Sequence, residues 1–172
     1  MTETQRSRTF TWTDPAAHVG ELGRLSGLDM LRSLAKGDLP RPPVMELLDA
    51  EGVDAEHGRV TFALEPREFH YNPLGTVHGG VISTMLDTAA ACAVHSMLPA
   101  GVSYTTLDLN VKFLRPVTVE SGRLTCTGEV IQRGRRTALA QARMVDTAGR
   151  LVAHATSSCM ILEVPGAAAP AA

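Results

Sequence analysis

The sequence predicts an α+β domain in which a long buried helix lies against an antiparallel sheet. Residues 79–98 contain no proline, and no glycine beyond the two at their start, which leaves room for about five helical turns. This run is apolar nearly all round, as a buried helix is. Segments that alternate apolar and polar side chains lie before and after it. Because the later segments follow one another through short turns, they favour a sheet around one helix.

Length and composition fit one soluble domain. The chain has 172 residues, 44% of them hydrophobic, and a net charge of -2. That charge gives no general positive field for nucleic acid or an anionic membrane. The N-terminus lacks the apolar stretch of a signal peptide, and no run reaches the length of a membrane span. We therefore expect a cytoplasmic protein that binds neither nucleic acid nor membrane.

The cysteines and histidines suggest no metal site. The three cysteines, Cys92, Cys126 and Cys159, are widely spaced and odd in number, so they predict neither a disulfide framework nor a zinc site. We expect them to be core thiols. The six histidines show no ligand spacing either.

The N-terminal part of the chain predicts an extension outside the compact domain. Leucines and methionine recur at helical spacing in residues 18–36 and predict one or two amphipathic helices that end at Gly37. The proline-rich residues 38–43 cannot continue a helix and predict a stiff linker. We assign residues 1–43 to this extension, residues 44–163 to the domain, and residues 164–172 to a disordered tail.

The domain begins with a short helical turn at 44–48, and several strands are expected. Residues 59–64 alternate as a half-buried strand does. In residues 104–113 the alternation places Thr105, Leu107, Leu109, Val111 and Phe113 on the core face. Residues 123–132 and 137–145 predict a hairpin turned by R-G-R-R, and residues 151–162 a last strand. The strands after the helix are expected to be neighbours in a meander.

Two residues of the central helix attract functional interest. Asp87 is the only formally charged residue between His78 and His95, and a buried carboxylate is costly unless it is paired, hydrogen-bonded or put to use. Gly79 opens the helix, where free N–H groups and the positive dipole end can stabilise an oxyanion. The structural alternatives are a hydrogen bond of Asp87 at a subunit contact, and close helix-sheet packing at Gly79 and Gly80.

The residues N-P-L-G-T-V-H-G-G-V-I-S-T-M-L-D at 72–87, followed by T-T-L-D-L-N-V-K-F-L-R-P at 105–116, resemble the PaaI-like hotdog-fold acyl-CoA thioesterases. The resemblance covers residues 44–162, and its motifs are specific in combination. It implies a curved antiparallel sheet wrapped around the central helix. It also implies an enzyme that hydrolyses acyl-CoA without a cofactor or metal, as a homodimer or a dimer of dimers.

The resemblance also implies roles for particular residues. Asp87 would be the catalytic carboxylate, Gly79 the oxyanion-hole donor, and Asn72 a partner of the thioester carbonyl. Thr106, where related enzymes can have Ser, would help to hold the water. His78 is interpreted as a hydrogen-bonded loop anchor that supports the site, and Asn72 has the alternative of a loop clasp before Pro73.

The chemistry agrees with one carboxylate acting alone. A thiol has a pKa near about 8.5, so it can depart as thiolate with little protonation. Asp87 could activate water or attack the thioester directly and form an anhydride, and the sequence leaves both routes open. Gly79 and Asp87 are separated by about 12 Å along one helix, at 1.5 Å per residue. One carbonyl cannot easily meet both, which predicts active sites shared between two antiparallel helices of a dimer.

Three further questions concern the arginine turn, the extension and rival functions. Arg133, Arg135 and Arg136 could contact the CoA phosphates, or could simply be solvated. The extension could serve packing and oligomerisation, or could cover the acyl pocket.

Rival functions are a non-catalytic acyl-CoA-binding hotdog protein and a hotdog enoyl-CoA hydratase. The first normally carries an output module that residues 1–40 do not resemble, and the second needs an Asp-His pair that His95 cannot supply.

Overall fold

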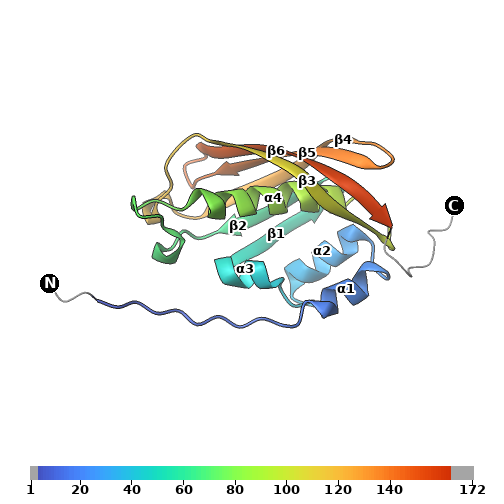
Figure 1. Cartoon of the computed structure of the whole chain (residues 1–172), viewed down its shortest axis with the longest axis horizontal. Helices are drawn as coiled ribbons and strands as arrows, with labels where there is room; N and C mark the ends of the chain where they lie inside the picture. The colour runs from blue at the N-terminus through green and yellow to red at the C-terminus, as the bar shows by residue number, and fades with distance from the viewer. Residues whose placement is uncertain (1–3, 164–172) are drawn as a thin grey trace.

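A computed structural model describes residues 4–163, and its elements follow the predicted order (Figure 1). The helices are α1 (Ala16–Leu22), α2 (Gly27–Lys36), α3 (Pro43–Leu48) and α4 (Gly79–His95). The strands are β1 (Ala50–Glu56), β2 (Arg59–Leu64), β3 (Val102–Phe113), β4 (Leu124–Arg133), β5 (Thr137–Val145) and β6 (Leu151–Glu163). Short 3₁₀ turns lie at Glu68–His70 and Val119–Ser121. The predicted disordered tail lies outside the described residues.

The sheet confirms the predicted α+β hotdog arrangement. Its six strands are antiparallel in the order β1-β2-β4-β5-β6-β3 and wrap around α4 (Figure 1). Strands β4, β5 and β6 form the expected meander, but placing β3 beside β4 was wrong. β3 pairs with β6 at the far edge, because the long connection through residues 114–123 carries the chain across the sheet. Within residues 4–163, no helix is long and apolar enough to cross a membrane.

Strand β1 was not predicted. Its residues A-E-G-V-D-A-E lack the alternation of apolar side chains that identifies a strand, and only Ala50 and Ala55 are buried. The strand forms because its backbone pairs with β2 and because α2 and α3 pack against it. Tertiary contacts therefore override a weak local preference here.

The prediction of the buried face of β3 was wrong before the bulge, and also at Phe113, which is 54% exposed. An irregularity between Thr106 and Asp108 shifts the register against β6. Thr105 and Leu107 are consequently exposed, while Thr106 faces α4 and bonds Asp87. An extra residue in a strand reverses the alternation on either side of it, and the sequence gives no sign of such a bulge.

The core lies between the sheet and the buried face of α4. Cys126 and Cys159 are fully buried, as predicted, whereas Cys92 is only half-buried at the edge of the helix. Alanines on the helix allow the sheet to approach closely. At Gly128 in β4, an added Cβ would lie 2.0 Å from the backbone oxygen of Ala89. This position has no room for any side chain.

We expect Gly128→Ala to lower the free energy of unfolding by at least about 1–3 kcal/mol, the usual cost of overpacking a tight core. Urea denaturation followed by circular dichroism measures this change in the free energy of unfolding. The matched control is Gly52→Ala in β1, where a Cβ would meet its nearest atoms at 3.8 Å. Equal denaturation midpoints for the two variants would contradict the close packing of β4 on α4.

The N-terminal extension is docked on the domain, and its two helices are confirmed. Ser26 caps α2 by accepting the Asp29 N–H at 3.2 Å, and Gly37 ends it at a φ of 82°. The Gly27 N–H donates to the Leu98 carbonyl at 2.9 Å, and a Cβ on Gly27 would meet the His95 carbonyl. The start of α2 therefore packs directly on the C-terminal end of α4.

Candidate active site

The loop before α4 is held in shape by Asn72. Its side-chain oxygen accepts the N–H groups of Leu74 at 2.9 Å and Thr76 at 3.3 Å, and its amide nitrogen donates to the Thr76 hydroxyl at 3.0 Å. This is the loop clasp considered from the sequence. A carboxamide nitrogen carries two hydrogens, so one remains for a ligand. The clasp and a role as carbonyl partner are therefore compatible.

His78 is the N-cap of α4. Its Nδ1 accepts the Gly80 N–H at 2.8 Å, so this ring nitrogen is not free to act as a base in this arrangement. This hydrogen bond is of the kind that the interpretation of His78 as a loop anchor predicts. The cap also occupies one of the free N–H groups at the helix start and leaves the one before it available.

Gly79 combines an available N–H with an adjacent cavity. Among residues 4–163, no acceptor bonds its backbone N–H. The Phe113 ring lies over the residue, and an added Cβ would be 3.1 Å from it. Gly79 and Asn72 both line a cavity of about 370 Å³ at this end of the helix. An acceptor oxygen in that cavity would meet the positive end of the helix dipole.

Asp87 lies farther along α4 and is half-buried. One of its oxygens accepts the Thr106 hydroxyl at 2.9 Å, which fixes the orientation of the carboxylate. In the described part of the chain, no cation forms an ion pair with it. Its second oxygen is therefore not committed to a positive partner, as a proton acceptor requires.

The candidate residues occupy two places in one chain. Asn72, His78 and Gly79 lie together at the N-terminal end of α4. Asp87 and Thr106 form a second pair about 12 Å along the helix. A single chain thus presents a donor group and an acceptor group that do not meet.

Cys92, Tyr104 and His95, which line one hollow together with Thr106, are neutral groups that sequence analysis did not select as site residues. Burial, with a contribution from Asp87, raises the pKa of the Cys92 thiol to about 12, and burial also raises the pKa of Tyr104. Burial lowers the pKa of His95 to about 4, so this imidazole is uncharged near pH 7. Cys92 is therefore a thiol rather than a nucleophilic thiolate. Cys92 and His95 lie on α4, so only the inward side of Tyr104 depended on the β3 bulge.

The arginine turn joins β4 to β5, and Arg133, Arg135 and Arg136 are exposed. None of them pairs with a carboxylate in residues 4–163. The turn lies at the same end of the sheet as Thr106, because Thr106 pairs with Cys159, which pairs with Ala138. Two strand spacings amount to about 10 Å. The turn is separate from the Asp87 pair but close enough for one extended ligand.

Comparisons with known proteins agree with this fold. A model of the thioesterase superfamily matches residues 74–153, which include Gly79, Asp87 and Thr106. A phenylacetic acid degradation-related protein from Ralstonia eutropha JMP134 is 31% identical in its crystal structure, with a TM-score of 0.69. That match covers 76% of this chain and 98% of the other.

Two further relatives are more distant or shorter matches. Acyl-coenzyme A thioesterase 13 of Homo sapiens is 26% identical over 103 residues, 59% of this chain and 72% of that protein. A protein of Halobacterium salinarum is 38% identical over 84 residues, 48% of this chain and only 54% of that protein's length. On the structural match, which covers 98% of the other chain, and the superfamily match together, the chain belongs to the thioesterase superfamily and has its hotdog fold.

Proposed function

We propose that the chain is an acyl-CoA thioesterase that hydrolyses an acyl-CoA thioester to the free acid and CoA. The observation that carries the proposal is that, among residues 4–163, α4 holds both an N–H with no acceptor at its positive end and a carboxylate with no cationic partner. Superfamily membership and the similarity to a named acyl-CoA thioesterase support the same reaction class.

In the proposed reaction, the thioester oxygen accepts the Gly79 N–H, and the remaining hydrogen of the Asn72 amide is a second donor. Asp87 takes a proton from water, whose oxygen attacks the carbonyl carbon, while the Thr106 hydroxyl keeps the carboxylate oriented. The tetrahedral intermediate then collapses, and the carbon–sulfur bond breaks. CoA leaves as a thiolate because an ordinary thiol has a pKa of about 8.5. Direct attack by Asp87, through an anhydride, uses the same geometry.

The proposed site is shared between two chains of a homodimer, since the donors and the carboxylate of one chain are about 12 Å apart. Antiparallel α4 helices would bring Gly79 of one chain to Asp87 of the other, with a dimer of dimers as a larger assembly. The edge strand β3 supports a site shared between two chains. Within the described residues no strand pairs with its outer edge, and Leu107 and Phe113 on it are about half exposed.

Thiol release from a panel of short, long and aryl acyl-CoA esters tests the function directly. We expect release of one CoA thiol per free acid formed. Binding of acyl-CoA without thiol release would identify a non-catalytic binding protein instead. Loss of the double-bond absorbance of an enoyl-CoA, without thiol release, would identify a hydratase.

Replacing Arg135 and Arg136 together with Ala is expected to raise KM for acyl-CoA several-fold and to leave short pantetheine thioesters almost unaffected. Guanidinium groups at the exposed turn would contact phosphates that pantetheine substrates lack. Steady-state kinetics with matched CoA and pantetheine esters measures the difference. Equal effects on the two substrates would mean that the arginines are simply solvated.

A further inference from the structure

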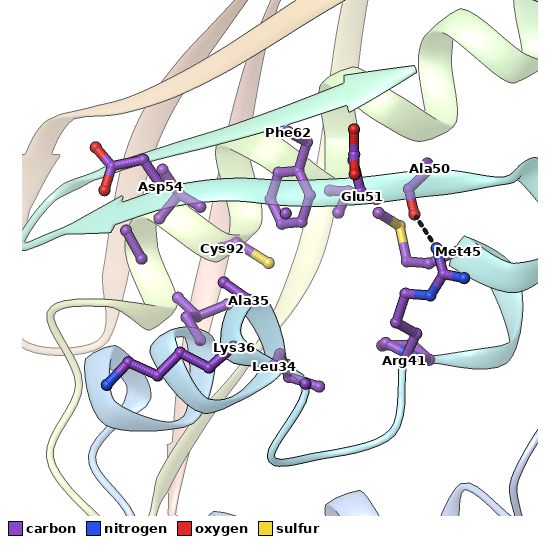
Figure 2. Close-up of a pocket in the computed structure, with 17 residues that line it drawn as sticks. Leu34, Ala35, Lys36, Arg41, Met45, Ala50, Glu51, Asp54, Phe62 and Cys92 are labelled. Atoms are coloured by element: carbon purple, nitrogen blue, oxygen red, sulfur yellow. Dashed lines mark hydrogen bonds between the residues drawn. The ribbon is translucent and has the colours of Figure 1, made fainter. Parts of the chain in front are cut away.

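The N-terminal extension encloses a cavity of about 300 Å³ between α2, the proline-rich linker, strands β1 and β2, and α4 (Figure 2). Its inner wall is apolar, and charged side chains stand around its rim. The wall includes Leu31, Met45, Val60, Phe62 and Cys92. An apolar cavity of about 150 Å³ stays dry and takes up benzene, so a cavity twice that size is suited to an apolar ligand.

This cavity shares part of its wall with a second hollow that reaches Thr106, the residue bonded to the proposed catalytic carboxylate. A second hollow, of about 570 Å³, shares Leu31, Leu34, Pro42 and Cys92 with the first. The second hollow is also lined by Thr106, whose hydroxyl bonds Asp87. A group bound under α2 would therefore extend from the neighbourhood of the reacting carbonyl into the apolar cavity.

The segments of the N-terminal extension that cover the cavity are held in place by hydrogen bonds. The Arg41 guanidinium donates to the Ala50 carbonyl at 3.3 Å, as Figure 2 shows, and its Nε bonds Glu46 at 3.0 Å. Arg32 donates to the Ala55 carbonyl at 3.2 Å, and the Gly27 N–H holds the start of α2. Because these segments are held in place, the cavity has a defined depth.

We propose that this cavity receives the acyl group of the thioester, and that the N-terminal extension sets the acyl length at about ten carbon atoms. The proposal rests on the proposed thioesterase function and names its substrate class, medium-chain acyl-CoA. The volume is about twice that of a cavity that takes up a six-carbon ring, so it holds at most about twelve carbon atoms, and a straight chain of about ten fits within it. The extension lies outside residues 74–153, so the length limit would come from a segment outside the superfamily match.

Two substitutions fill the cavity from opposite walls. Ala35 of α2 lines it, and Figure 2 shows this residue between Lys36 and Cys92. Gly52 of β1 lies opposite, where an added Cβ would be 3.8 Å from Ala35 and Phe62. Ala35→Phe and Gly52→Leu therefore place new carbon atoms inside the cavity. Gly20→Leu is the matched control, since a Cβ there meets nothing within 4 Å.

The experiment measures kcat/KM for acetyl-, hexanoyl-, decanoyl- and palmitoyl-CoA. We expect the parent to prefer decanoyl-CoA, and each filling variant to lower the decanoyl-to-acetyl ratio by about 10-fold or more. Gly20→Leu should keep the parental ratio. A parent that prefers acetyl-CoA, or filling variants that fold but leave the ratio unchanged, would overturn the proposal.

Binding separates this proposal from the proposed function. Isothermal titration calorimetry with decanoyl-CoA and acetyl-CoA, in the Asp87→Asn background so that the esters are not hydrolysed, measures binding without turnover. If the unfilled Asp87→Asn protein binds decanoyl-CoA more tightly and the filling substitutions remove that preference, the cavity is the acyl site even where no thiol is released. If thiol is released but neither binding nor kcat/KM depends on the fillings, the thioesterase function stands and the acyl site lies elsewhere.

Discussion

Asp87→Asn is expected to lower kcat for acyl-CoA hydrolysis by about 10²–10⁴-fold, the usual contribution of a general base. An amide cannot accept the proton of the attacking water, and it is too weak a nucleophile to form the anhydride. The substitution keeps the shape of the side chain and can still accept the Thr106 hydroxyl, whose bond to Asp87 is 2.9 Å long. The variant should therefore fold normally, and the loss should appear in turnover.

Thiol release under substrate saturation measures this effect, and the urea denaturation midpoint checks the fold. Thr106→Val is the companion variant, because it removes the orienting hydroxyl but leaves the carboxylate. We expect its loss of kcat to be smaller than that of Asp87→Asn. If a normally folded Asp87→Asn enzyme hydrolysed acyl-CoA as fast as the parent, the proposed mechanism would be wrong under either route.

The parts of the fold that local sequence determines were predictable. Gly79–His95 forms the expected helix because nothing within it interrupts hydrogen bonding and its small apolar residues suit burial. α2 ends at Gly37 because that residue adopts a φ of 82°, which favours glycine. In both cases the signal lies within a few residues of the feature.

The parts that depend on distant contacts were not predictable. β1 exists through its pairing with β2, and β3 reaches the far edge of the sheet through a long connection. The bulge after Thr106 reverses the faces of β3, so alternation alone placed Leu107 in the core. The cavity under α2 is formed by segments from residue 31 to residue 92 that no local pattern relates.

The candidate site likewise combines features that the sequence predicts with features that only the structure shows. The spacing of Gly79 and Asp87 on one helix follows from the sequence, and so does the inference that one chain cannot bring them together. Which hydrogen-bonding groups of the site remain available does not follow from the sequence. Only the structure shows that His78 is occupied by the Gly80 N–H, and that Asn72 uses most of its hydrogen-bonding capacity within its own loop.

The central claim is that each active site combines Asn72 and Gly79 of one chain with Asp87 of its partner. Complementation between two inactive variants tests it. The first is Asp87→Asn, and the second is Asn72→Asp, which keeps an oxygen to accept the Leu74 and Thr76 N–H groups but loses the amide donor. Loss of one oxyanion donor costs about 10²–10³ in kcat. Each variant alone should therefore be nearly inactive.

The most direct measurement is the activity of mixed dimers that carry one chain of each variant, isolated through two different affinity tags. In a shared arrangement, one site of each mixed dimer has both lesions and the other has none, as two-fold symmetry requires. The account predicts about half of the parental activity per dimer. If every site lay within one chain, each site would carry one lesion. Activity of confirmed mixed dimers at the level of the separate variants would then contradict the account.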